Sequence, residues 1–300
     1  MRELFDLDPV WCIRPEYVGE VCRDWLRMAG MEDTPTPEMQ AQKRGGEQRI
    51  EGAVAVLPIH GPIFHRANLL TRWGYGCASE EWGRMFDSIA ASDDIGAIVL
   101  DVDSPGGMHA GTEDMANRIY KARRAGRPII AVSNDLMASA AYWAGSAADE
   151  VVVSPGSLTG SVGVILMHVE FSKALDAMGV KVNLIQAGEF KTEGNPYEPL
   201  TDEGRKHLQS LVDSAYADFR AGAARNRGVD ADTVEMDFGQ GRVYGERDAI
   251  RRGLADREAT LDQVLLKLGV KNPGKQMPIG ADRPAGIRNA MRRRRAEIGR

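Results

Sequence analysis

The chain has 300 residues, of which 43% are hydrophobic and 27% charged, and its formal net charge at pH 7 is -5. This composition is that of an ordinary globular protein with ample material for a core, and it excludes nucleic-acid binding driven by overall charge. The cysteines Cys12, Cys22 and Cys77 show no C-x-x-C spacing, so we expect a reducing, cytoplasmic compartment and neither a disulfide framework nor a zinc site. No apolar run approaches the roughly 18 residues of a membrane span, so we expect no membrane insertion.

Composition divides the chain into three regions. Residues 1–50 are expected to form an amphipathic helix from Pro15 onward, followed by a linker rich in Pro, Gln, Glu, Lys and Gly. Residues 51–270 alternate between apolar runs and amphipathic stretches, as expected for a folded domain. Residues 271–300 are rich first in Pro and Gly and then in Arg, which predicts a basic, flexible tail.

Strands and helices are expected to alternate along the main domain. Short β-branched runs predict buried strands at 53–59, 97–102, 128–132 and 151–153. The stretches between them predict helices, one of which is capped by Ser79 and ends near Ala91. This order indicates an α/β fold of βαβ units with a mostly parallel sheet, in which ligands bind beyond the carboxyl ends of the strands.

The second half of the domain is expected to be mainly helical. A turn and a strand at 158–166, a helix at 171–178 and a strand at 180–186 come first. A long helix then starts at the cap Thr201 and ends at Gly228. Two shorter helices are expected near 246–252 and 259–268.

Ser139 lies where the strand at 128–132 meets, after a polar turn, a helix of small residues and aromatics. Backbone N–H groups are unpaired at the start of a helix and the helix dipole favours negative charge, which suits a nucleophile. The same position is also common for a serine that only caps a helix. This stretch alone leaves both interpretations open.

A nucleophilic serine needs a base, and donors that hold the oxyanion. His168 follows Ser139 in the same domain, but its apolar strand context favours a packed side chain, and no aspartate is placed to orient it. Lys191 lies in a glycine-flanked loop; it can act as a base when desolvated and neutral, and is otherwise an ordinary surface charge. Gly106 and Gly107 either permit a tight turn or bring a backbone N–H close to a substrate carbonyl.

Four segments occur in order along the chain: Asp103-Ser104-Pro105-Gly106-Gly107, Met137-Ala138-Ser139-Ala140-Ala141-Tyr142, Leu158-Thr159-Gly160-Ser161-Val162-Gly163-Val164 and Gly188-Glu189-Phe190-Lys191. Together they resemble the signal peptide peptidase A family of Ser–Lys peptidases, which share the ClpP/crotonase fold, over about residues 53–268. The resemblance implies that Ser139 is the nucleophile and Lys191 the general base, with no metal and no cofactor. It also implies that the Gly106-Gly107 turn, with Gly107 as the preferred donor, and the amide of Ala140 hold the oxyanion. Ser161 either orients Lys191 through its hydroxyl or only closes the turn before its strand.

Within this family the chain is more similar to the phage and prophage branch of capsid maturation (protease C-like) peptidases, because the N-terminal transmembrane helix of membrane-bound members is not seen in this sequence. That branch implies a homo-oligomeric endopeptidase that cleaves scaffold, portal or coat precursors in the assembling procapsid, in the host cytoplasm. Nucleic acid is expected, if at all, only at the basic tail. Three alternatives stay open: a cytoplasmic signal peptide peptidase-like protease that degrades peptides, a crotonase-like acyl-CoA enzyme and a catalytically silent assembly protein.

Overall fold

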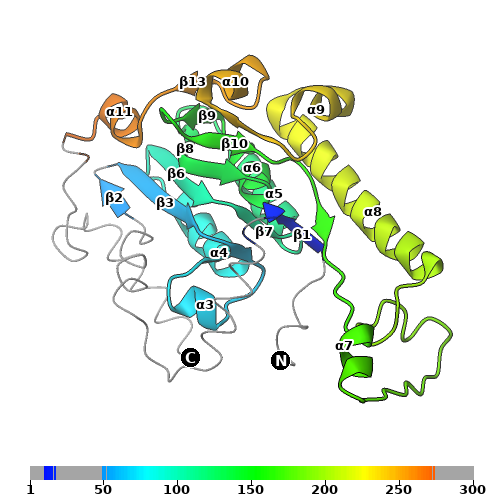
Figure 1. Ribbon diagram of the computed structural model, residues 1–300. Coiled ribbons are helices and arrows are strands. Elements are labelled where there is room, and N and C mark those ends of the chain that lie inside the picture. The colour runs from blue at the N-terminus through cyan, green and yellow to red at the C-terminus, as the bar shows by residue number, and fades with distance from the viewer. Residues whose placement is uncertain (1–9, 16, 18–48, 52, 272, 274–300) are drawn as a thin grey trace, which may run out of the picture.

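A mostly parallel sheet forms the body of the protein, whose computed structural model describes residues 10–15, 17, 49–51, 53–271 and 273 (Figure 1). Its parallel strands are β3 (Val54–His60), β6 (Ala97–Ser104), β8 (Ile129–Ala138), β9 (Glu150–Val153) and β10 (Leu158–Gly160). Three short strands extend it: β2 (Arg49–Glu51) and β12 (Val243–Gly245), which are antiparallel, and β13 (Arg257–Glu258), which is parallel to β9. The expected α/β class, with a mostly parallel sheet of βαβ units, is confirmed.

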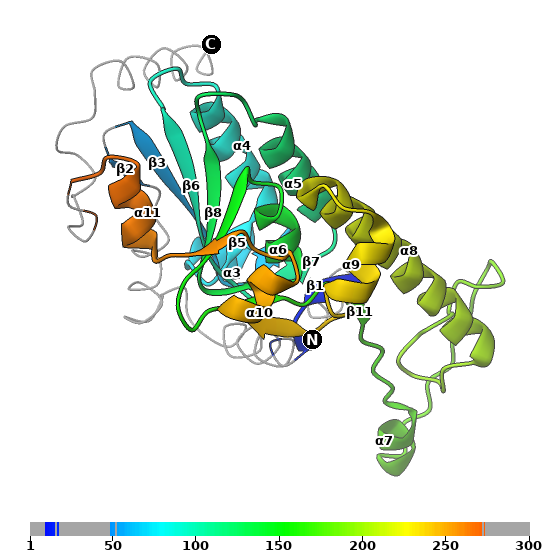
Figure 2. The same ribbon diagram turned by 90° about the horizontal axis from the view of Figure 1, so that it is seen from above.

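Helices cover both faces of this sheet (Figure 2). One face is covered by α4 (Ser79–Ala90), α5 (Thr112–Lys121), α6 (Ala140–Gly145) and the C-terminal half of α8 (Asp202–Arg227). The fully buried side chains of Phe86, Trp143 and Phe219 belong to the core between these helices and the sheet. The opposite face is covered by α11 (Leu261–Lys267), which packs Val264 and Leu265 against the valines of β3, β6 and β8. The main core therefore lies on the side of the sheet that carries Ser139 and α6.

The predicted ends of the long helix α8 are confirmed. The Thr201 hydroxyl accepts a hydrogen bond from the Gly204 N–H at 3.0 Å, and Gly228 ends the helix with a φ of 67°, which a glycine adopts at little cost. Two short helices follow, α9 (Ala231–Asp237) before β12 and α10 (Glu246–Arg251) after it. The helical C-terminal part thus agrees with the prediction.

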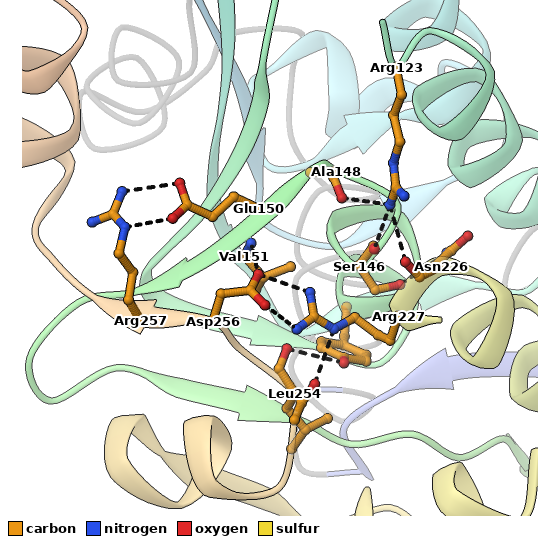
Figure 3. A network of polar contacts seen from close by, with 12 residues as sticks. Arg123, Ser146, Ala148, Glu150, Val151, Asn226, Arg227, Leu254, Asp256 and Arg257 are labelled. Carbon is orange, nitrogen blue, oxygen red and sulfur yellow. Dashed lines mark hydrogen bonds and ion pairs between the residues drawn. The ribbon is translucent and has the colours of Figure 1, made fainter. Parts of the chain in front are cut away.

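Polar contacts fasten the end of α8 and the returning chain to the sheet (Figure 3). Arg227 donates two hydrogen bonds to the Asp256 carboxylate, at 2.6 and 3.0 Å, and the same carboxylate accepts from the Val151 N–H at 2.7 Å. Nearby, Arg257 forms a two-pronged ion pair with Glu150. These contacts hold the chain that follows α10 against β9.

A second, five-stranded sheet continues from the carboxyl end of β6. Its order is β11 (Ile165–Leu166), β1 (Val10–Ile13), β7 (Gly106–Met108), β4 (Ile63–Phe64) and β5 (Cys77–Ala78), with the short helix α3 (Leu69–Arg72) beside it. Strand β1 was not predicted, because its partners lie far along the chain. The helix expected from Pro15 onward lies outside the described residues except at Pro15 and Tyr17. So do the linker, except at residues 49 and 50, and the basic tail, except at residues 271 and 273.

The predicted cap of α4 and the strand predicted at 180–186 are wrong. Helix α4 begins at Ser79, but its N-cap is Ala78, and the Ser79 hydroxyl donates to the His65 carbonyl at 3.3 Å. The run 180–186 is not a strand, although its β-branched residues predict one. A strand needs a neighbouring strand to pair with, and these residues are exposed with no such neighbour in the described chain.

Residues 167–200 form an outer lobe that stands away from the body, beyond the N-terminal end of α8 (Figure 1). It contains the predicted short helix, here α7 (Ser172–Ala177), and a run of turns. Ten large apolar side chains of the lobe are exposed: Met167, Val169, Phe171, Met178, Val180, Val182, Leu184, Ile185, Phe190 and Tyr197. In the part of the chain that the structure describes, no helix combines the length and the apolar character needed to cross a membrane.

Candidate active site

Ser139 stands at the abrupt junction between β8 and α6. The sequence predicted that this strand ends at Val132, but in the structure it continues through the expected polar turn to Ala138. Helix α6 starts at the residue directly after Ser139. Ser139 therefore turns the chain within one residue, with φ 55° and ψ -121°, a conformation that costs energy for a side chain with a Cβ. Such strained positions are concentrated at functional sites.

The Ser139 side chain does not cap the helix. Residue 139 occupies the N-cap position of α6, yet its hydroxyl makes no capping hydrogen bond. It donates instead to the Gly163 carbonyl, at a long 3.5 Å, and the residue is fully buried. The simple helix-cap interpretation of Ser139 is therefore excluded by the geometry.

The two glycines after β6 are tightly packed, the first of them against this serine. Gly106 has a φ of 100°, and a Cβ added to it would lie 2.8 Å from the Cβ of Ser139. A Cβ added to Gly107 would lie 1.9 Å from the Ile63 carbonyl oxygen. Both positions therefore require glycine, the first for its φ and both for close approach. As predicted, the turn and Ser139 meet at the carboxyl edge of the sheet.

The loop from Gly160 to Gly163 closes the other side of Ser139. The Ser139 N–H donates to the Gly160 carbonyl at 2.8 Å. Ser161 is buried, has a φ of 54°, and donates its N–H to the Arg242 carbonyl at 2.6 Å. Ser161 thus lies in the turn beside Ser139, and both interpretations of its hydroxyl stay predictions.

Lys191 is not brought to Ser139 within one chain. It is exposed in a run of turns of the outer lobe, whereas Ser139 is fully buried under α6. The lobe itself lies away from the sheet in both views (Figures 1 and 2). His168 is on the same lobe, where its Nε2 lies 3.2 Å from the Gly194 carbonyl oxygen, so it is not placed as a base for Ser139 either.

Helix α6 is held in place by contacts that the sequence did not reveal. The Trp143 ring stacks on Phe219 of α8, with centroids 4.8 Å apart and planes at 7°. Asn226, near the end of α8, donates to the Trp143 carbonyl at 3.2 Å and to the Ser146 hydroxyl at 3.0 Å. The Tyr142 hydroxyl donates to the Leu254 carbonyl at 3.2 Å, and burial raises the pKa of this phenol. In the sequence, the one hint of these contacts is Asn226, a polar residue on the otherwise apolar face of α8.

Comparison with known proteins places the chain in a family. The model of peptidase family S49 matches residues 121–272, about half of the chain, and this range includes both Ser139 and Lys191. The chain therefore belongs to peptidase family S49, which agrees with the family of peptidases that the sequence resembles.

The relatives of the chain include both phage and cellular proteins. The chain is 32% identical to the capsid assembly protease C of Escherichia phage lambda, over 77% of this chain and 50% of that protein. It is 27% identical to a putative signal peptide peptidase SppA of Enterococcus faecium, over 68% of this chain and 59% of that protein. A solved structure of a ClpP1 mutant from Listeria monocytogenes overlays on 70% of this chain and 94% of its own, with a TM-score of 0.44 and 12% identity. The chain thus spans about half the length of its phage relative.

Proposed function

We propose that this chain is a serine endopeptidase in which Ser139 is the nucleophile and Lys191 the general base. The observation that carries the proposal is the strained, buried Ser139 at the first turn of α6, packed directly against the Gly106-Gly107 turn. The neutral Lys191 amine takes the Ser139 proton, and the serine oxygen attacks the peptide carbonyl. The C–N bond breaks as the proton passes to the leaving amine, and water then hydrolyses the ester.

In this scheme the backbone amides of Gly107 and Ala140 hold the oxyanion. Gly107 lies on β7 and follows Gly106, the glycine packed against Ser139. The Ala140 N–H is one of the first amides of α6, which have no partner within the helix. Donors of this kind contribute on the order of 10²–10³-fold each to the rate. The glycine turn is then as important to catalysis as the base.

A second copy of the chain is the proposed source of the base. Lys191 sits on an exposed lobe rich in apolar side chains, and a monomer seldom leaves so much apolar surface in water. Docking of this lobe on a neighbouring copy would bury the apolar residues and remove water from around the lysine, which favours its neutral form. The active enzyme is accordingly a homo-oligomer, in which each site takes its serine and its lysine from different copies.

The proposed substrates are capsid, scaffold or portal precursors, cut during procapsid assembly in the host cytoplasm. This part of the proposal rests on the similarity to a relative named capsid assembly protease C. Co-expression of the chain with the capsid and scaffold proteins encoded beside it tests the substrate class directly. New N-termini found by mass spectrometry, and absent with Ser139→Ala, are the expected result.

The dyad is tested by labelling and by complementation. A fluorophosphonate probe should label Ser139 in the wild-type chain and not in Ser139→Ala; a chain that resists labelling while still cleaving its substrate would refute the nucleophile. Co-expressed Ser139→Ala and Lys191→Ala chains should recover roughly a quarter of the wild-type sites if copies mix at random. No recovery in a mixed oligomer would show that the lysine acts within its own chain.

A further inference from the structure

The N-terminal strand β1 lies between the edges of β7 and β11, two strands near Ser139. It pairs antiparallel with β7, in the register Trp11–Met108, Cys12–Gly107 and Ile13–Gly106, and antiparallel with β11, in the register Val10–Leu166 and Trp11–Ile165. Without β1, β7 and β11 would face each other across a gap one strand wide. The edge of β7 carries the two glycines, Gly106 and Gly107. The edge of β11 follows Gly163, whose carbonyl accepts a hydrogen bond from the Ser139 hydroxyl.

The register pairs Cys12 with Gly107, whose N–H is a proposed oxyanion donor. The Arg14 N–H donates to the Pro105 carbonyl at 3.2 Å, and the His109 N–H to the Val10 carbonyl at 3.3 Å. Hydrogen-bonded pairs alternate along an antiparallel ladder, so the pair midway between these two, Cys12 and Gly107, is also a hydrogen-bonded pair. The Gly107 N–H is therefore directed at the Cys12 carbonyl.

The same carbonyl lies next to the nucleophile. The position that a Cβ on Gly106 would take is 2.2 Å from the Cys12 carbonyl oxygen and 2.8 Å from the Cβ of Ser139. The Cys12 carbonyl and Ser139 are thus neighbours that meet at the Cβ position of Gly106. A peptide substrate needs this arrangement at the bond to be cut: an extended strand whose carbonyl faces both the oxyanion donor and the serine.

We propose that β1 occupies the groove in which a substrate strand binds, and that it displays the side-chain pattern of that substrate: a small uncharged residue at the position of Cys12, between large apolar residues. This inference rests on the proposed function, because it takes Ser139 and Gly107 as the reacting site. The groove is the gap between β7 and β11, and a substrate enters it only when β1 leaves.

The environment of β1 explains the pattern. The Cys12 side chain is fully buried in the main core, which leaves room for a small residue only. Trp11 and Ile13 point to the other face and pack with Phe64, Leu70 and Trp73, and the Trp11 and Phe64 rings meet edge to face at 6.5 Å. A charged side chain at position 12 would be buried among apolar groups, at a high cost.

The thiol of Cys12 offers a direct test, because it is shielded while β1 is in place. The full chain carries Cys22→Ser, Cys77→Ser and Ser139→Ala, so that Cys12 is its one thiol and peptides are bound but not cut. The probe is the chain's own sequence 9–15 with alanine for cysteine, Pro-Val-Trp-Ala-Ile-Arg-Pro. It is supplied at millimolar concentration, because a tethered strand has a local concentration on the order of millimolar. The control peptide, Pro-Val-Trp-Arg-Ile-Ala-Pro, has the same composition with arginine at the central position.

We expect the first peptide to speed alkylation of Cys12 by iodoacetamide by about tenfold or more, since alkylation follows the population of the open state. The control peptide should leave the rate unchanged. Equal rates with both peptides, whether slow or fast, would overturn the inference. This readout needs no catalysis, so it can succeed even if Ser139 proves not to be the nucleophile.

A second measurement uses the chain with its natural Ser139. Trp11→Ala removes the main apolar anchor of β1 and should raise the rate of fluorophosphonate labelling by about tenfold or more. Met236→Ala, at a residue of α9 that is 76% exposed, is the matched control and should change nothing. Thermal melts of both variants establish that the body stays folded. Unchanged labelling of a folded Trp11→Ala chain would count against β1 as the occupant, while the proposed function would stand.

Discussion

Gly222→Ala should destabilise the protein although it replaces a glycine within a helix. Gly222 lies inside α8, and a Cβ at this position would be 2.2 Å from Nε1 and 2.8 Å from Cε2 of Trp143. The Trp143 ring cannot easily move away, because it is fully buried and stacked on Phe219. The new methyl group must therefore push α6 and α8 apart.

The size of the effect follows from two opposing contributions. Replacing glycine by alanine within a helix normally stabilises by about 1 kcal/mol. Forcing a methyl group into a filled core costs about 1–3 kcal/mol, and the 2.2 Å approach places this case near the upper end. We expect a net loss of about 1–2 kcal/mol, which for a domain of this size lowers Tm by about 2–8 °C. Because α6 begins directly after Ser139, a shift of about 1 Å can also reduce the reaction rate by around 10²-fold.

Gly83→Ala is the matched control, since Gly83 is also a buried glycine within a helix. A Cβ there would meet the flexible Arg118 side chain at 3.0–3.4 Å, which can give way, so this variant should keep or raise Tm. Thermal melts measure stability, and the rate of fluorophosphonate labelling of Ser139 measures the site. The packing argument would be refuted if Gly222→Ala matched Gly83→Ala in both measurements.

Three further predictions concern stability, the oxyanion turn and assembly. Burial alone would raise the pKa of Asp256, but hydrogen bonds from Arg227 outweigh burial and lower this pKa. The Asp256 carboxylate therefore stabilises the fold fully above the unfolded pKa of about 3.9, and this stabilisation is lost as the pH falls through the pKa of the folded state. Asp256→Asn should thus lower the free energy of unfolding by about 1 kcal/mol at pH 7, a figure reduced because the carboxylate is 40% exposed. Near pH 3 the loss should be much smaller. Urea unfolding measures both values, and an equal loss at the two pH values would contradict the prediction. Gly107→Ala places a methyl group on the Ile63 carbonyl and should slow labelling of Ser139 by about 10²-fold or more, whereas wild-type labelling would mean that this amide is not a donor. Ile185→Glu puts a charge on the outer lobe at a residue that is 99% exposed, so light scattering should show smaller particles with an unchanged protomer Tm; unaltered assembly would exclude this part of the lobe from the interface.

Local patterns were enough to predict the body of the fold and half of the candidate site. The apolar runs of β3, β6, β8 and β9 and the caps of α8 depend on residues close together in sequence, so periodicity and capping chemistry show them directly. Ser139 and the Gly106-Gly107 turn could be placed together because both follow parallel strands, whose carboxyl ends meet at one edge. The segment around Lys191 was singled out only by the family resemblance, and its place in space could not be predicted.

Only the tertiary structure decided how Ser139 is held and what lies around it. Its left-handed φ, its uncapped hydroxyl and its contact with Gly106 depend on the sharp junction of β8 with α6, which the sequence alone leaves open between a helix cap and a nucleophile. The separation of Lys191 from Ser139 and the insertion of β1 beside Gly107 are set by pairing and packing between segments far apart in the chain. Such contacts leave no periodic trace in either segment, because each strand or lobe carries only its own half of the interaction.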